Sequence, residues 1–197
     1  TTSDGTKFGK SMGNAVWLDP AQTSPYRFYQ FWLNVTDDDV IGYLRTFTFL
    51  SVGDIEDIEK QHQTDPGLRE AHRTLAREVT RLVHGEEGVA AAERISDALF
   101  RNELTDLSDG DLAQLALDGM DRTDVSNETL LMDALVNSGL AVTPRGDVTR
   151  GQARKLIEGN SIRVNGVKVT DVEVRLTNAT SLHGRFNVVQ NGKKNHH

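Results

Sequence analysis

Two lysines three residues apart, Lys7 and Lys10, lie near the start of the chain in the segment Lys-Phe-Gly-Lys-Ser. Glycines precede, separate and follow them, which lets the backbone come close to a ligand. Lysine adds a compact positive charge on a mobile side chain. Mobile cations suit a polyphosphate, because they can follow its charge into the transition state of a reaction. The segment therefore indicates a ligand that carries several phosphates.

The ending Gly9-Lys10-Ser11 is shared with the nucleotide-binding P-loop, but the rest of that motif is missing. The P-loop has a glycine five residues before its second glycine, and Asp4 occupies this position. Nor does the sequence predict the helix that would hold the phosphates, because Met-Gly-Asn and an apolar Ala-Val-Trp-Leu segment follow Ser11. Spacing and context therefore exclude a P-loop.

The composition is that of a globular protein that can bury a core. The 197 residues are 37% hydrophobic and 26% charged. We find no apolar run long enough to cross a membrane and no N-terminal signal pattern. The absence of cysteine excludes disulfides and thiolate metal sites and is compatible with a reducing cytoplasm. We therefore expect a cytoplasmic protein without a membrane partner.

The net charge of −7 is unevenly distributed along the chain. Residues 143–197 contain ten basic and four acidic side chains, whereas residues 1–142 contain 12 basic and 25 acidic ones. A basic C-terminal part on an acidic body is expected when the partner is a polyanion. A basic surface that arose without any partner fits this charge distribution equally well.

Capping residues and apolar spacing predict an all-α bundle over residues 20–118. Its first helix is rich in aromatic residues, which we expect to form core rather than to stack on bases. Residues 119–127 are polar and without periodicity, as in a linker. The expected helices are 26–34, 40–47, one that Ser51 opens and that runs through Ile58, 66–84, 86–100 and one that follows Ser108.

A stripe of arginines recurs every four residues on the longest predicted helix, at Arg69, Arg73, Arg77 and Arg81. Residues at this spacing share one helix face. An RNA contact is one interpretation of the stripe. A solvated face with local ion pairs to residues such as Glu70 and Glu78 is the preferred one.

Residues 128–197 combine helices with a small sheet. Helices are predicted at 129–138 and at 150–158, the second capped by Thr149. Asn165-Gly166 between two apolar segments is a strong hairpin signal, with strands at 161–164 and 167–169. Alternating segments at 172–177 and 185–190 read as further strands. The whole chain is therefore predicted to be α+β, with a helical bundle followed by a small α+β domain.

The first segment resembles the KMSKS signature loop of class I aminoacyl-tRNA synthetases, in the form typical of bacterial tyrosyl-tRNA synthetases. The resemblance continues through Leu82-Val-His-Gly-Glu-Glu87 and covers essentially the whole chain. It implies the C-terminal half of such an enzyme, without the catalytic half that carries the HIGH motif and the tyrosine pocket. The implied parts are the signature loop and connector (1–19), a helical anticodon-binding domain (20–118), a linker (119–127) and an S-four-like RNA-binding domain (128–197).

The resemblance implies tyrosine–tRNA ligase activity, in which ATP activates tyrosine and the product is transferred to tRNA(Tyr). Lys7 and Lys10 would neutralise the β- and γ-phosphates of ATP, Gly9 would line the ATP site and Ser11 would support the loop. Mg²⁺ is expected with ATP in the full enzyme. Because the catalytic half is missing, we expect this portion alone to be inactive. The family dimerises through that same half, so the resemblance is compatible with a monomeric state for this portion.

The same resemblance implies contacts to tRNA(Tyr) at its anticodon and its long variable arm. Asp37 is the expected reader of the first anticodon base, a guanine or modified guanine, although plain helix capping is a rival role for this carboxylate. The S-four-like domain would contact the variable arm. Its expected RNA-binding residues are Arg150, Arg154, Lys155, Arg163, Asn165, Lys168, Arg185, Lys193 and Lys194.

The remaining polar residues carry no catalytic or metal-binding pattern in the sequence. His62, His72 and His84 have no metal-ligand spacing, and we expect no metal site. The alternative to the ligase is a stand-alone tRNA- or rRNA-binding module without catalysis. The Lys-Phe-Gly-Lys-Ser loop favours the ligase, because a pure RNA-binding protein has no need of a loop for ATP phosphates.

Overall fold

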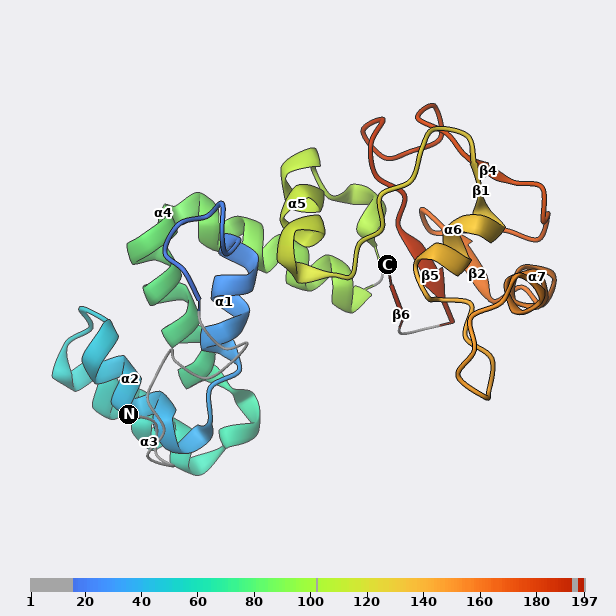
Figure 1. Ribbon diagram of the computed structural model, residues 1–197. Coiled ribbons are helices and arrows are strands. Elements are labelled where there is room, and N and C mark those ends of the chain that lie inside the picture. Colours follow the sequence, from blue (N-terminus) through green and yellow to red (C-terminus); the bar gives the residue numbers. More distant parts are fainter. Residues whose placement is uncertain (1–15, 102, 193–194, 197) are drawn as a thin grey trace. The chain divides into compact units, whose positions relative to one another are not determined.

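The structure is a computed structural model that describes residues 16–101, 103–192 and 195–196 (Figure 1). The predicted phosphate-binding segment, with Lys7, Gly9, Lys10 and Ser11, lies outside the described residues, as do Lys193 and Lys194. The chain divides into two compact units, residues 1–96 and 97–197, and each is described separately. None of the described helices is long and apolar enough to cross a membrane.

Helices are the only regular secondary structure in the described part of the first unit (Figure 1). Hydroxyl groups cap two of its helices: Ser24 accepts a hydrogen bond from the Arg27 amide at 3.0 Å, and Ser51, which the sequence predicts to open a helix, forms a reciprocal capping box with Asp54. The elements are α1 (Pro25–Leu33), α2 (Asp37–Phe47), α3 (Val52–Thr64), the 3₁₀ turn η1 (Pro66–Leu68) and most of α4 (Glu70–Arg101).

Aromatic side chains of α1 form the centre of this unit. Phe28, Tyr29 and Trp32 are buried against Leu44 of α2 and Leu75 of α4. The Trp32 ring meets the Tyr43 ring edge to face at a centroid distance of 6.0 Å. The prediction that these aromatics form core is therefore confirmed. This packing fixes the N-terminus of α2, where Asp37 lies.

The longest helix starts later than the sequence predicts. Pro66 opens only the turn η1, and α4 begins at Glu70. Arg69 separates the two because its φ of 52° is left-handed and cannot continue a right-handed helix. Its guanidinium donates to the carbonyl of Leu33 at 2.6 Å, a contact between distant residues that local sequence patterns do not reveal.

Gly85 breaks α4 where the sequence predicts one helix to end and another to begin. Its φ of 73° and ψ of −177° lie in a region that is essentially restricted to glycine. The helical segments on the two sides of Gly85 therefore run in different directions. The predicted boundary at His84-Gly85 is confirmed, although both helical segments are included in the single element α4, Glu70–Arg101.

Replacing Gly85 by alanine is expected to lower the free energy of unfolding by about 1–3 kcal/mol. No atom lies within 4 Å of an added Cβ at this position, so the cost comes from the backbone conformation alone. Gly42, in α2, is a matched control: it also has no atom within 4 Å of an added Cβ, and alanine there should stabilise the helix. Urea denaturation measures both changes. Equal effects of the two substitutions would contradict the strain at Gly85.

The second unit combines short helices with two antiparallel sheets (Figure 1). The larger sheet has the order β3-β2-β5-β6, and β1 pairs with β4. The elements are η2 (Leu104–Asp106), α5 (Asp109–Gln114), the π-helical turn η3 (Leu115–Gly119), β1 (Thr129–Leu130), α6 (Leu131–Asn137), α7 (Arg150–Glu158), β2 (Ile162–Val164), β3 (Val167–Lys168), β4 (Arg175–Leu176), β5 (Val189–Asn191) and β6 (Asn195–His196).

One face of the larger sheet is covered by α6 and α7. Leu135 of α6 and Ile157 of α7 are buried together with Ile162 of β2 and Val189 of β5. Thr149 caps α7 by accepting from the Gln152 amide at 3.1 Å, as the sequence predicts. This packing sets which residues of α7 and of the sheet face outward.

The predicted hairpin is present. Val164 pairs with Val167, and the two intervening residues have positive φ, 49° at Asn165 and 79° at Gly166. Two positive φ values define the tight turn that Asn-Gly favours. The predicted α+β class, with a helical bundle followed by a small α+β part, is confirmed.

The other strands differ from the prediction in length. Only 175–176 of the segment 172–177 is a strand, and only the end of 185–190 joins β5. His183 and Gly184 have positive φ and form a turn, with Leu182 bridging to Phe186. Alternation of residue types does not reveal where partner strands end. Residues 104–119, which the sequence assigns mainly to the helical domain, belong to the second compact unit. The predicted linker at 119–127 stays a prediction.

Candidate nucleic-acid interface

Asp37 is the first residue of α2, and its side chain is 61% exposed. The N-cap of the helix is Thr36, whose hydroxyl donates to Asp39 Oδ2 at 2.8 Å. Thr36 therefore occupies the N-cap position, and its hydroxyl is hydrogen-bonded to Asp39 and not to Asp37. Asp37 adds favourable charge to the first turn of the helix, which still leaves its carboxylate accessible from solvent.

Two histidines lie beside the Asp37 carboxylate. The Nε2 atoms of His62, in α3, and His72, in α4, are 3.6 Å and 3.5 Å from Asp37 Oδ1. His72 is fully buried, and its Nε2 also lies 3.2 Å from the Val35 carbonyl. Three helices thus bring together side chains that are 10 to 35 residues apart in the sequence. No spacing motif in the sequence signals this cluster.

Burial lowers the pKa of His72, and the positive charge of Arg69 adds to this effect. The Asp37 carboxylate acts in the opposite direction. Because the lowering effects are the larger ones, His72 is held in its neutral form. A neutral imidazole keeps a lone pair on one of its ring nitrogens.

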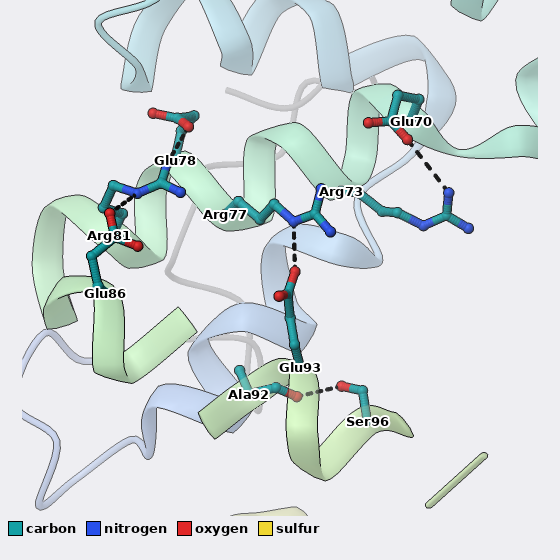
Figure 2. Close-up of polar contacts among 9 residues, drawn as sticks. All are labelled: Glu70, Arg73, Arg77, Glu78, Arg81, Glu86, Ala92, Glu93 and Ser96. Carbon is teal, nitrogen blue, oxygen red and sulfur yellow. Dashed lines mark hydrogen bonds and ion pairs between the residues drawn. The ribbon is translucent and has the colours of Figure 1, made fainter. Parts of the chain in front are cut away.

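The stripe arginines that lie in α4, Arg73, Arg77 and Arg81, form ion pairs with the protein's own carboxylates (Figure 2). Arg73 pairs with Glu70 at 3.5 Å, and Arg81 pairs with both Glu78 and Glu86. The preferred interpretation, a solvated face with local ion pairs, is confirmed for these residues. Arg77 reaches across the Gly85 break to Glu93 at 2.5 Å, which links the two helical segments (Figure 2).

The basic residues of the second unit form more than one group. Arg150, Arg154 and Lys155 are exposed on α7. Arg150 pairs with Asp133 at 2.6 Å, and Arg154 lies 3.8 Å from Glu158. Exposed ion pairs of this kind contribute only about 0–1 kcal/mol, so RNA phosphates can replace the carboxylates at small cost.

Arg163 and Lys168 belong to the sheet. They are directly opposite each other in the β2–β3 pair, so their side chains share a face. Side chains alternate along a strand, and the neighbouring Ile162 is buried under α6 and α7. Arg163 and Lys168 therefore lie on the sheet face turned away from α7. The sequence suggests one basic surface. In the structure, the basic residues of α7 and the pair Arg163 and Lys168 lie on opposite sides of the sheet.

Asn165 is held by the protein itself. Its Nδ2 donates to the Thr180 carbonyl at 3.0 Å, and its Oδ1 accepts from the Val188 amide at 2.9 Å. The side chain thus ties the hairpin to the segment that leads into β5. This is a structural task for Asn165, and its proposed RNA contact stays a prediction.

Arg185 is also paired within its own unit. Its Nη1 lies 3.1 Å and 3.0 Å from the two carboxylate oxygens of Asp109, and its guanidinium stacks over the Phe186 ring. The neighbouring His183 ring hydrogen-bonds the Leu107 carbonyl at 2.8 Å. Sequence analysis did not anticipate that these residues attach the 183–186 turn to the start of α5. An RNA role for Arg185 would compete with Asp109.

Both parts of the chain match profiles of known families. Residues 1–101 match a family described as tRNA synthetases class I (W and Y), and residues 111–197 match the tyrosine–tRNA ligase SYY-like C-terminal domain. A tyrosine–tRNA ligase of Cronobacter sakazakii is 47% identical over 196 residues, and one of Laribacter hongkongensis is 49% identical over 195. These alignments cover 100% and 98% of this chain and 44% of each relative.

A similar solved structure is that of a C-terminally truncated mitochondrial tyrosyl-tRNA synthetase of Aspergillus nidulans. It is 39% identical, and the match covers 44% of this chain and 26% of that one. The TM-score of 0.42 is too low to compare the folds. The chain thus spans less than half the length of the relatives that it matches.

Proposed function

Since this chain belongs to the tyrosyl-tRNA synthetase family of class I tRNA synthetases, we propose that it supplies the ATP-phosphate loop and the tRNA-binding part of a tyrosine–tRNA ligase. The observation that carries the proposal is the succession of the two family matches, which together take in residues 1–101 and 111–197. A stand-alone RNA-binding module would not explain why the first match includes the Lys-Phe-Gly-Lys-Ser segment.

In this proposal ATP activates tyrosine to tyrosyl-adenylate, and the tyrosyl group is then transferred to tRNA(Tyr). Lys7 and Lys10 neutralise the β- and γ-phosphates of ATP while tyrosine attacks the α-phosphate, and Gly9 and Ser11 shape the loop. Mg²⁺ accompanies ATP and shares in neutralising its phosphates. The complete protein forms a homodimer through residues that precede this portion, and it acts in the cytoplasm.

Recognition of tRNA(Tyr) is proposed to use both units. Asp37 reads the first anticodon base, because a carboxylate accepts from the two donor groups on the Watson–Crick edge of guanine. The exposure of Asp37, and its position outside the helix cap, support this role. Arg150, Arg154 and Lys155 of α7 contact the phosphates of the variable arm, since they are exposed on one short helix and their ion pairs are weak.

The direct test compares the chain alone with the protein that includes its catalytic half. The chain alone is expected to bind tRNA(Tyr) but to show no tyrosine-dependent ATP–pyrophosphate exchange, because the proposal assigns the tyrosine pocket to the catalytic half. The longer protein should catalyse exchange and charge tRNA(Tyr). If the longer protein binds RNA without any exchange activity, the stand-alone RNA-binding function replaces the ligase.

Replacing both Arg150 and Arg154 by alanine is expected to weaken tRNA(Tyr) binding and to flatten its dependence on salt. Each lost phosphate contact lowers the slope of log K against log salt by roughly 0.7–0.9, so the slope should fall by between one and two units. Fluorescence anisotropy over a salt series measures this slope. The control replaces Arg73 and Arg77, which have the same spacing and also pair with carboxylates, Glu70 and Glu93, but have no proposed RNA contact. An equal change in the control would argue against an interface at α7.

A further inference from the structure

The cluster of Asp37, His62 and His72 offers three potential metal ligands. One oxygen of Asp37 and one ring nitrogen of each histidine all lie within 4.8 Å of one another. The residues come from the N-terminus of α2, the C-terminal part of α3 and the first turns of α4. Their positions are set by the core beneath them, in which Leu75 of α4 packs against Leu44 of α2.

The donor types and separations fit a divalent transition-metal ion. Two imidazole nitrogens and one carboxylate oxygen are a common ligand set for Zn²⁺. Bonds of 2.0–2.2 Å in a tetrahedral site place ligand atoms about 3.3–3.6 Å apart. The separations of Asp37 Oδ1 from the two Nε2 atoms, 3.5 Å and 3.6 Å, fall at this spacing. The ligand nitrogens of the two histidines lie within 4.8 Å of each other.

Hydrogen bonding within the protein does not account for the cluster. Both separations from Asp37 are too long for an ordinary hydrogen bond. In the described part of the chain, the Nδ1 atoms of His62 and His72 are buried without a hydrogen-bond partner. Among the described residues, the His72 ring has one hydrogen-bond contact, at 3.2 Å from Nε2 to the Val35 carbonyl. Neither contact between Asp37 and a histidine is therefore an ordinary hydrogen bond, although all three side chains converge.

The site is open on one side. The side chain of His62 is 10% exposed and that of His72 is buried, whereas Asp37 is largely exposed. A cation can therefore enter from the Asp37 side, and water can complete its coordination.

We propose that Asp37, His62 and His72 form a binding site for a divalent transition-metal ion such as Zn²⁺. Binding makes Nε2 the ligand atom of both rings, which moves the proton of each neutral ring to Nδ1 and gives up the contact of His72 with Val35. Occupancy also engages the Asp37 carboxylate. A bound ion would thus oppose tRNA binding at the anticodon, a consequence that rests on the proposed function of Asp37.

The test is calorimetric titration of the chain with ZnCl₂. His196 and His197 are additional potential ligands in the sequence, so all proteins carry H196A and H197A. We expect one ion per chain, with at least tenfold weaker binding in H62Q and in D37N. D38N is the matched control, because it removes a neighbouring charge of the same helix turn and should bind Zn²⁺ as the reference does. Visible absorption of the Co²⁺-loaded protein should show the intense bands of a low-coordinate site.

Absence of saturable binding, or equal affinity in the reference, H62Q and D37N, would overturn the proposal. H62Q and D37N carry the test because their side chains reach the surface, whereas H72Q changes a buried residue and can fail to fold. A second titration measures tRNA(Tyr) affinity with and without ZnCl₂. Zinc that binds at the cluster without changing tRNA affinity would support the metal site and contradict the anticodon role of Asp37.

Discussion

Replacing Lys7 or Lys10 by alanine in the complete ligase is expected to lower the rate of tyrosyl-adenylate formation by about 10²–10³-fold. In the proposed function, each lysine places a positive charge where negative charge develops on the pyrophosphate leaving group. That interaction is stronger in the transition state than with bound ATP, so the rate falls more than substrate affinity does. Tyrosine binding should change little, because neither residue contacts the amino acid in this proposal.

Pyrophosphate exchange and single-turnover kinetics measure the two effects separately. Lys60→Ala is the control, because Lys60 is an exposed helix residue that pairs with Asp57 at 3.0 Å and has no proposed contact with ATP. Exchange rates that stay unchanged in both loop variants would remove Lys7 and Lys10 from the reaction. A loss of tyrosine affinity equal to the loss of rate would point to a folding defect instead.

Replacing Asp37 by asparagine is expected to reduce charging of tRNA(Tyr) by roughly 5- to 150-fold, the range for a base contact of about 1–3 kcal/mol. The amide turns one acceptor into a donor, which then faces a donor of guanine. For a tRNA whose first anticodon base is not guanine, the substitution should reduce charging much less, because that tRNA does not make the contact with Asp37. The variant should therefore discriminate poorly between the two tRNAs.

The measurement is kcat/KM for charging of both tRNAs by the complete protein. Asp38→Asn makes the same change in charge one residue along α2 and should leave the preference for guanine intact. Equal losses on the two tRNAs in Asp37→Asn would show that Asp37 supports the fold or the overall charge and does not read the base.

Local features of the structure follow closely from the sequence. Hydroxyl caps at Ser24, Ser51 and Thr149, the turn at Asn165-Gly166 and the helix break at Gly85 are all where residue types predict them. The physical reason is that each depends on a few neighbouring residues. A cap needs one hydroxyl and the amide two or three positions later, and glycine and asparagine adopt a positive φ more readily than other residues.

Strand lengths and the beginning of α4 depend on distant residues. Arg69 leaves the helical conformation and binds the Leu33 carbonyl, 36 residues away in sequence. Strands β4 and β5 extend only as far as β1 and β2 pair with them. Alternation and capping patterns describe a segment by itself, so they predict that a strand exists but not how far its partner extends.

The candidate site divides in the same way. By itself, the sequence determined the family resemblance, the α+β class, the charge of the C-terminal part and Asp37 as a candidate base reader. The tertiary structure alone placed two histidines from α3 and α4 against Asp37 and separated the basic residues of α7 from Arg163 and Lys168. The reason is that side chains from different helices or strands meet only after the core packs, and core packing joins residues whatever their distance in the sequence.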